Sequence, residues 1–441
     1  MKGKSPHITV IGGGAFGGWT ALQLLERGAR VTLIDAWEPG HLRGTSSGET
    51  RVIRCGYGTK TIYTDWTWRA LALWKRWQRE WRTQLFVNSG VLWLCAGETK
   101  EIRAALGTLR SRRIPFKRLT RAALERRYPQ MSFTGIRFGI LEPRAGFLYA
   151  RAATMRVAQA VAEHPCGRLL IARALAPDSK LDLVTSGRNS KLATRKSKSE
   201  KRKTAALLPT PHSLLPVPAS RLSTPDSRFP YLAALRLSTG ASLPGDAFVF
   251  ACGPWLPQLF PRLLGRRIRV TQQDVFFFGP PPGDCRFEPE AMPVWIEPSG
   301  DYYCLPAADA RGVKIACDAP GPLFDPTTSE RRADPAGAAA ARRHLARRLP
   351  ALKSAPLVEM RVCQYERTPD SHLVIDRHPD FGNVWLVGGG SGHGFKLGPA
   401  VGQFLAAQIL SRRPLDIPAE MRLGASAWPV SGPLPVTHSF W

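Results

Sequence analysis

The stretch HITVIGGGAFG, residues 7–17, decides the fold of this chain. Its first five residues are typical of a short buried strand, and an apolar-periodic helix is expected at 16–27. Between them Gly12, Gly14 and Gly17 have the spacing G-x-G-x-x-G. The first glycine permits a tight turn, the second lets the backbone approach a pyrophosphate, and the third allows close packing of helix on strand. The stretch therefore predicts a phosphate-binding turn between a strand and a helix.

The next strand is expected at 31–34 and ends in Asp35. This carboxylate can accept hydrogen bonds from a ribose, and its charge argues against a 2′-phosphate. The N-terminus of the expected helix adds N–H groups and a positive dipole end for the phosphates. A glycine-rich turn without a ligand would not need the acid. The unit therefore predicts a Rossmann-like α/β domain that binds a dinucleotide.

A second glycine-rich loop, Gly388-Gly-Gly-Ser-Gly-His-Gly-Phe-Lys396, lies near the end of the chain. It falls between an expected strand at 384–387 and an expected helix at 398–410. Loops at the carboxyl ends of strands are where such sheets bind ligands. Two glycine loops from opposite ends of the chain suit a long cofactor, which favours FAD over NAD. The predicted contacts in this loop are Gly390, Gly392, Gly394 and Lys396.

Composition excludes some functions and leaves others open. At 441 residues and 44% hydrophobic content, the chain can fold as two globular domains. No apolar run reaches the roughly 20 residues that a membrane helix needs, so we expect a cytoplasmic protein. The eight cysteines form no CxxC pair, so free thiols are expected and no metal site is predicted.

The formal net charge of +28 admits nucleic-acid binding as an alternative function, but attraction of an anionic substrate and an anionic cofactor accounts for the same charge. The stretch 185–228 carries a Lys/Arg cluster at 195–203 and is rich in Pro and Ser, which predicts a disordered surface insert. A basic protein with a degenerate flavin fold is the corresponding alternative.

Three tryptophans predict a buried helix face. Trp74, Trp77 and Trp81 fall on one face of a helix expected at 65–81, a stripe typical of core packing.

Three segments resemble one enzyme family. The segment TSSGETRVIRCGYG (45–58), the segment CQYERTPDSHLVIDRHP (363–379) and the glycine loop GSGHGFK (390–396) are similar to monomeric sarcosine oxidase and its N-methyltryptophan and pipecolate oxidase relatives. The resemblance implies an antiparallel-sheet substrate domain, α+β in class, that covers the flavin and is formed by 88–146 and 261–363. The FAD domain would then comprise 1–87, 147–260 and 364–441.

The resemblance also implies roles for several residues. Arg54 and Lys396 would hold a substrate carboxylate, and Arg51 would lie against the flavin. Cys363 would carry FAD through a bond from its sulfur to the 8-methyl carbon, and Lys314 would activate O2. The residues alone leave other functions open: a phosphate contact or structural ion pair for Arg54, a solvated charge for Lys396, an edge-strand charge for Lys314.

Three tyrosines complete the predicted site. Tyr302 and Tyr303 are adjacent on one expected strand, so one should face the flavin and the other the core. Tyr365 flanks the predicted flavin-attachment cysteine. Two positions depart from the family pattern: Ser47 and Asp318 stand where histidines are typical. Both positions are near the flavin or the substrate in that family, so sarcosine itself is in doubt as substrate.

The reaction implied is the oxidation of a secondary amino acid, N-methyl or cyclic. Hydride would pass from the carbon next to a neutral amine to flavin N5, the imine would hydrolyse, and O2 would be reduced to H2O2. The chain would supply positioning and electrostatics rather than a strong base, and would act as a monomer. The alternative is a dehydrogenase that passes electrons to a quinone or a protein, against which Lys314 argues.

Overall fold

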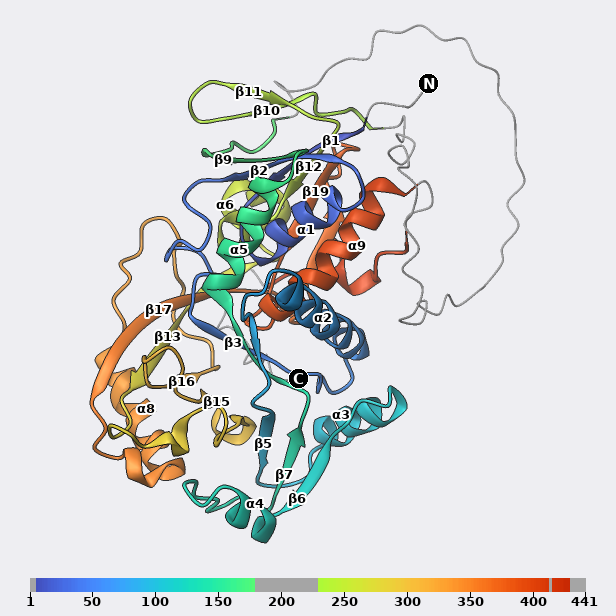
Figure 1. Ribbon diagram of the computed structural model, residues 1–441. Helices are drawn as coiled ribbons and strands as arrows, with labels where there is room; N and C mark the ends of the chain where they lie inside the picture. Colours follow the sequence, from blue (N-terminus) through green and yellow to red (C-terminus); the bar gives the residue numbers. More distant parts are fainter. Residues whose placement is uncertain (1–4, 179–228, 412–414, 429–441) are drawn as a thin grey trace, which may run out of the picture.

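A computed structural model describes residues 5–178, 229–411 and 415–428. The predicted insert at 185–228 lies outside these residues. The described chain forms a sheet flanked by helices and, at the opposite end, a second and larger sheet (Figure 1). The α/β class and the Rossmann-like unit predicted from the glycine turn are confirmed, whereas the residue limits of the two domains stay a prediction.

The first sheet contains five parallel strands, as expected for a βαβ fold. Its order is β18-β19-β12-β1-β2-β9, and only β18 runs antiparallel to its neighbour. The strands are β1 (His7–Ile11), β2 (Arg30–Asp35), β9 (Gly167–Ile171), β12 (Ala247–Phe250), β18 (Val374–Arg377) and β19 (Val384–Gly388). The carboxyl ends of β1, β2 and β12 thus meet at one edge of the sheet.

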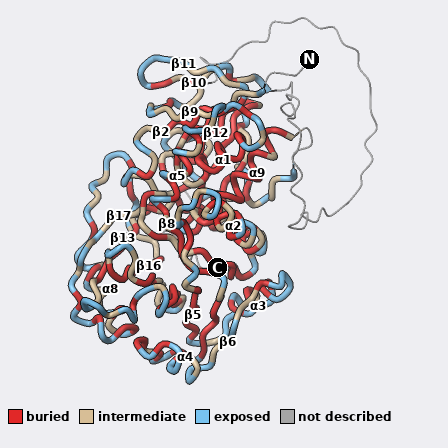
Figure 2. Tube along the Cα trace, viewed as in Figure 1, coloured by how far each residue is buried: buried red, intermediate tan, exposed pale blue. Residues whose placement is uncertain are grey.

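Alternate residues of these strands build the cores on the two faces of the first sheet. Val10 and Leu33 pack with the helices of one face, while Ile11 and Ile34 pack on the other face. The helices of the first face are α1 (Ala15–Leu25), α2 (Thr61–Glu80), α5 (Ala150–Glu163) and α9 (Gly398–Leu410). Figure 2 shows α1, α9 and the strands beside them almost wholly buried. The other face carries the β10–β11 hairpin (Ala234–Arg236, Ser242–Pro244), α6 (Leu256–Leu259) and α7 (Pro261–Leu264).

The second sheet has eight strands in the order β17-β13-β16-β15-β14-β5-β7-β6. The strands are β5 (Val91–Cys95), β6 (Lys117–Thr120), β7 (Phe138–Glu142), β13 (Arg269–Phe278), β14 (Val294–Glu297), β15 (Tyr302–Leu305), β16 (Val313–Cys317) and β17 (Leu357–Arg367). The sheet is antiparallel except at one place: β5 and β14 pair in parallel where the two halves of the sheet meet. Its helices are α3 (Lys100–Ser111), α4 (Arg121–Arg127) and α8 (Pro335–Arg348).

A small antiparallel sheet connects the two larger ones. It comprises β3 (Thr50–Ile53), β4 (Phe86–Val87) and β8 (Gly146–Tyr149). Strand β3 was not expected from the sequence, since its four residues lie within a segment rich in glycine and charge. The strand fixes Arg51 and positions Arg54 directly after its end.

Candidate active site

The first glycine turn has the geometry that its sequence predicts. Gly12 has a φ of +101°, and a Cβ there would lie 2.4 Å from the carbonyl oxygen of Ala251. A Cβ at Gly17 would lie 1.8 Å from the carbonyl oxygen of Gly12. Both contacts are far too short for a side chain, so the packing of α1 on the end of β1 and of this turn on the residue after β12 requires glycine.

Asp35 ties this turn to the end of β2. Its Oδ2 accepts a hydrogen bond of 2.6 Å from the Gly13 N–H, and its Oδ1 accepts one of 3.0 Å from the Trp37 N–H. Burial raises the pKa of this carboxyl. Gly14 lies beside Ser46, whose hydroxyl accepts the Ala15 N–H at 2.9 Å in the first turn of α1.

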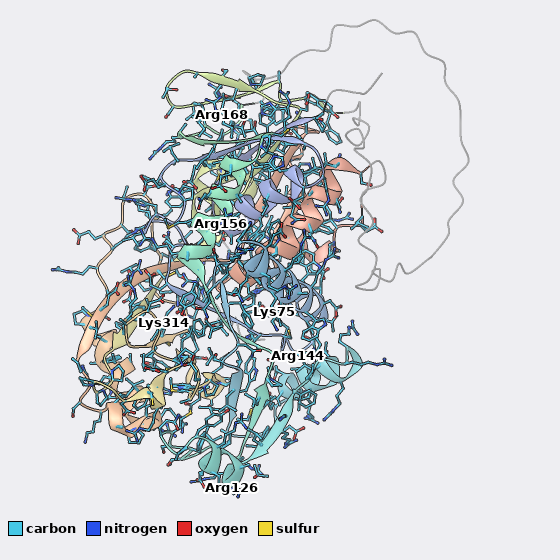
Figure 3. The ribbon with its side chains drawn as sticks, viewed as in Figure 1. Lys75, Arg126, Arg144, Arg156, Arg168 and Lys314 are labelled. Carbon is cyan, nitrogen blue, oxygen red and sulfur yellow. The ribbon has the colours of Figure 1, made fainter. Side chains whose placement is uncertain are left out.

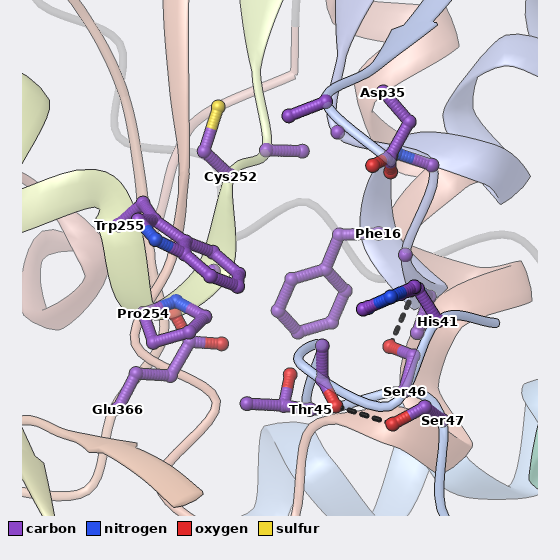
Figure 4. Close-up of a pocket in the computed structure, with 18 of the residues that line it drawn as sticks. Phe16, Asp35, His41, Thr45, Ser46, Ser47, Cys252, Pro254, Trp255 and Glu366 are labelled. Carbon is purple, nitrogen blue, oxygen red and sulfur yellow. Dashed lines mark hydrogen bonds between the residues drawn. The ribbon is translucent and has the colours of Figure 1, made fainter. Parts of the chain in front are cut away.

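A cavity of about 360 Å³ begins at this turn and reaches the second glycine loop. Figure 4 shows Phe16, Asp35, Trp255 and Glu366 around it. It is lined by Gly12–Phe16, Asp35–Glu38, Thr45–Ser47, Arg51, Cys252–Trp255, Cys363–Glu366, Gly390, Gly392, Gly394 and Phe395. Both glycine loops, the start of a helix and a carboxylate therefore face one elongated space. This donor set fits a dinucleotide with a second ring system beyond its phosphates.

The second loop is as tightly packed as the first. Gly392 has a φ of +80°, and a Cβ there would lie 2.5 Å from the ring of Tyr365. Beneath this loop lies Glu366, which the sequence reasoning did not single out. Its Oε2 accepts the Gly389 N–H at 3.2 Å, and burial raises the pKa of its carboxyl to about 7. The available signal was an acid three positions after the predicted flavin-attachment cysteine.

Arg51 and Cys363 meet at the wall of this cavity. The guanidinium Nη2 of Arg51 lies 3.4 Å from the sulfur of Cys363 and 2.9 Å from the carbonyl oxygen of Thr45. Cys363 is a free, half-buried thiol. Ser47, the first departure from the family pattern, is buried, and its hydroxyl donates to the Gly44 carbonyl at 2.6 Å.

A smaller cavity of about 40 Å³ adjoins the first and shares Arg51, Tyr365, Gly392 and Phe395 with it. Its other lining residues are Thr50, Val52, Arg54, Ile296, Tyr303, Asp318, His393 and Lys396. Three cations, Arg51, Arg54 and Lys396, and the carboxylate of Asp318 thus line one space. The structure brings together the residues that the sequence predicted for the substrate carboxylate.

Arg54 is only 3% exposed and lies over two aromatic rings, 4.4 Å from the centroid of Tyr57 and 4.9 Å from that of Trp93. It also donates to the carbonyl of Gly56. Cation–π contacts of this kind fix the guanidinium plane. Tyr57 was missed as a site residue, although it lies inside the segment 45–58 that carries the resemblance.

Lys396 is 5% exposed, which rules out a solvated charge. Its Nζ donates to the Tyr57 hydroxyl at 3.0 Å and to the His393 carbonyl at 2.9 Å. Burial and the charge of Arg54 hold the pKa of Lys396 well below its usual value. His393 was also missed. Its ring is buried, with Nε2 at 2.9 Å from the carbonyl oxygen of Ser371.

Lys314 is buried at 2% exposure on β16, which lies between β13 and β15. The alternative of an edge-strand lysine facing solvent is therefore wrong. Figure 3 shows Lys314 within the second sheet. Its Nζ donates to the Thr50 carbonyl at 2.8 Å, and burial together with Arg51 holds its pKa well below the usual value.

The two adjacent tyrosines divide as the strand alternation predicts. Tyr303 lines the small cavity, and its hydroxyl lies 3.4 Å from that of Tyr365. Tyr302 faces the other side of β15 and stacks on His344, with ring centroids 4.1 Å apart. Tyr302 is therefore not at the cavity, and its inclusion among the site residues is corrected. Asp318, the second departure, is 1% exposed and lines the cavity near Lys396.

The described part of the chain was searched for metal-binding groups and for membrane-spanning helices. Among residues 5–178, 229–411 and 415–428, no group of three or more His, Cys, Asp or Glu side chains is placed to hold a metal ion. Within the same ranges, no helix has the length and apolar character needed to cross a membrane.

Comparison with known proteins identifies the family. Residues 7–171 and 232–408 match the DAO family, described as FAD dependent oxidoreductase. The chain is 25% identical over 409 residues to monomeric sarcosine oxidase of Bacillus sp. (strain B-0618), with 92% of each chain covered. It is 25% identical over 403 residues to human peroxisomal sarcosine oxidase, with 90% of each covered.

Among solved structures, L-proline dehydrogenase from P. horikoshii has a similar fold, with a TM-score of 0.73 at 18% identity. The alignment covers 95% of this chain and 97% of that one. The cavity between the two glycine loops and the family match over residues 7–171 and 232–408 agree. The chain belongs to the DAO family of FAD-dependent oxidoreductases.

Proposed function

We propose that the protein is an oxidase of a secondary amino acid, N-methyl or cyclic, that uses O2 as electron acceptor. The observation that carries this proposal is the pair of buried cations, Arg54 and Lys396, in one cavity next to the FAD cavity. An arginine and a lysine that line the same buried space can attract and hold an anionic group of the substrate. A carboxylate is the anion common to amino acids.

The two cations differ in what they offer. The guanidinium of Arg54, held over Tyr57 and Trp93, presents a rigid fork for both carboxylate oxygens. Lys396 adds a point charge from the other end of the chain. Asp318 has the opposite charge and lines the same cavity, where its carboxylate would accept a hydrogen bond from the substrate amine. The cavity thereby orients the amino acid and excludes water from the reacting carbon.

FAD, when bound, accepts two electrons from the C–N unit of the substrate and gives them to O2. Lys314 supports the second half of this reaction, because a buried ammonium lowers the energy of superoxide as it forms. Arg51 adds a second positive charge near Lys314. We also propose that the sulfur of Cys363 attaches to the 8-methyl carbon of the flavin, since this thiol lines the FAD cavity.

The relatives support the reaction class. Two of the compared proteins are named as sarcosine oxidases, and sarcosine is an N-methyl amino acid. The fold also occurs in an L-proline dehydrogenase, whose named substrate is a cyclic secondary amino acid. A cytoplasmic location and a monomeric state stay predictions.

A substrate screen tests the proposal. The purified holoenzyme is incubated in air with N-methyl amino acids, with cyclic amino acids and with their primary counterparts, and H2O2 is measured. H2O2 should form with at least one secondary amino acid and fail to form with its methyl ester, which lacks the carboxylate. Activity with an artificial quinone but none with O2 would instead establish the dehydrogenase alternative.

A further inference from the structure

A row of aromatic rings runs from the FAD cavity toward the surface of the protein. Phe395 lines both cavities. Its ring stacks on Trp74, with 5.9 Å between centroids and 18° between planes. Trp74 meets Trp19 edge to face at 5.0 Å, and Trp19 stacks on Trp81 at 5.9 Å. We propose that this row is a path for one-electron transfer between bound FAD and an external reductant, separate from amine oxidation.

The inner end of the path is fixed to the site. The indole Nε1 of Trp74 donates to the Lys396 carbonyl at 2.9 Å, so Trp74 is the indole held directly behind the second glycine loop. Trp19 and Trp74 are 2% and 0% exposed, respectively. Water therefore cannot reach the middle of the row, and a charge on these rings is poorly stabilised there. A positive charge on Trp74 or Trp19 is therefore expected to move along the row to the next ring.

The outer end of the path, at Trp81, is not fully buried. Trp81 is partly exposed at the end of α2 and touches Trp77, with 4.7 Å between centroids. The guanidinium of Arg156, on α5, lies 4.7 Å from the Trp81 ring centroid. Its positive charge disfavours a radical cation on that ring and favours release of the indole proton to water. A neutral radical then remains on Trp81 and cannot easily return inward.

Core packing alone explains an aromatic stripe on α2, but it does not require this continuity. The stripe from α2 would pack equally well on aliphatic side chains. Instead Trp19, on α1, contacts Trp74, Trp77 and Trp81. The indoles, the oxidisable rings of the row, thereby form one connected set, and only Phe395 separates it from the cavity.

The oxidant would be bound FAD excited by blue light, and Trp74 would give it one electron across the ring of Phe395. The electron deficit then moves from Trp74 to Trp19 and on to Trp81, which loses its N–H proton to water. A thiol at the surface gives one hydrogen atom to the Trp81 radical and becomes a thiyl radical. The net change is one electron from the thiol to FAD, with one proton released to solvent.

Flash photolysis of the oxidised holoenzyme tests the path, without amino acid or O2. A blue flash should produce the neutral tryptophanyl absorption, and a thiol should shorten its lifetime. Trp19→Phe should reduce the yield of the long-lived radical by about an order of magnitude. Trp81→Phe should shorten its lifetime to a similar extent, and Trp74→Phe should lengthen the flavin fluorescence decay. Trp66→Phe is the matched control: it lies on the same helix, but its ring packs on Phe404.

Retained FAD absorbance shows that each variant has folded. If the Trp19 and Trp81 variants keep FAD and give the parent's radical yield and lifetime, the path is wrong. A long-lived tyrosyl signal in place of the tryptophanyl signal would also overturn it, since Tyr365 and Tyr57 lie near the same cavities. The proposal rests on FAD binding and not on the substrate, so inactivity toward secondary amino acids leaves this result unaffected.

Discussion

The guanidinium of Arg51 lies against the sulfur of Cys363, with 3.4 Å between Nη2 and Sγ. The two residues are 312 positions apart in the chain. One comes from β3 of the small connecting sheet and the other from β17 of the large one. Their contact closes the wall of the FAD cavity at the point where both sheets meet it.

Replacing this cysteine tests covalent attachment. In the parent protein the yellow colour should stay with the acid-precipitated pellet, and in Cys363→Ala it should move to the supernatant. Cys252→Ala is the matched control, because Cys252 also lines the FAD cavity but lies on another wall. A yellow pellet from Cys363→Ala, or release of colour from the parent, would show that this sulfur holds no flavin.

Removing either cation of the small cavity should weaken substrate binding. Each charged hydrogen bond contributes about 1.5–3 kcal/mol, so Arg54→Met and Lys396→Met should each raise KM roughly ten- to a hundredfold. Arg112→Met is the control, since Arg112 is exposed and pairs with Asp65 at 2.9 Å. Steady-state H2O2 assays give KM for all three. Unchanged KM in both cavity variants would refute the carboxylate site.

Lys314→Met should separate the two halves of the reaction. The variant keeps the side-chain length but loses the charge, so reoxidation by O2 should slow roughly a hundredfold. Anaerobic reduction by substrate serves as the internal control and should change little. Rapid-mixing absorbance at the flavin band measures both rates. Equal reoxidation rates in variant and parent would remove Lys314 from the O2 step.

Carboxylate affinity should fall as pH rises. The pKa of Lys396 is lowered in the free site, and a bound carboxylate raises it again, so binding takes up a proton. Above the lowered pKa of Lys396, the affinity of the small cavity for a carboxylate therefore decreases as pH rises. Titration of the holoenzyme with propionate, which has no amine to oxidise, measures this dependence. Lys396→Met should flatten it, and an unchanged slope in that variant would assign the proton to another group.

Glu366 should make stability depend on pH. Its pKa is raised from 4.5 to about 7 in the folded protein. Between these two values the folded state holds a proton that the unfolded state has lost, so stability falls as pH rises through this window and not below it. The loss is roughly 3 kcal/mol at most. Urea unfolding of Glu366→Gln, measured below and above the window, should lack this fall. The same pH dependence in the variant would contradict it.

The strand–glycine–helix unit at 7–35 could be predicted from the sequence because its interactions are local. Asp35 bonds the N–H of Gly13, and Gly17 packs on the carbonyl of Gly12, all within a single βαβ unit. The class of the fold followed from this unit and from the second glycine loop. The alternation along β15 also predicted that Tyr302 and Tyr303 face opposite sides, because side-chain direction in a strand is a local property, but it did not say which of them lines the cavity.

The remaining features depend on contacts between distant parts of the chain. Tyr57 meets Lys396 across 339 positions, and strand β3 exists because Gly146–Tyr149 pairs with it. The parallel pairing of β5 with β14 likewise joins two halves of a sheet that the sequence separates. No periodicity in these segments carries that information. Glu366 shows the same limit, since its raised pKa comes from burial under a loop that follows it in the chain.

The most direct test of the proposed function is one anaerobic-to-aerobic experiment on the holoenzyme. A secondary amino acid is mixed anaerobically with the enzyme, flavin absorbance is followed, and air is then admitted. The account predicts bleaching by the amino acid, followed by recovery much faster than that of free reduced flavin, with one H2O2 formed for each amine oxidised. No bleaching by any N-methyl or cyclic amino acid, or recovery no faster than free flavin, would contradict it.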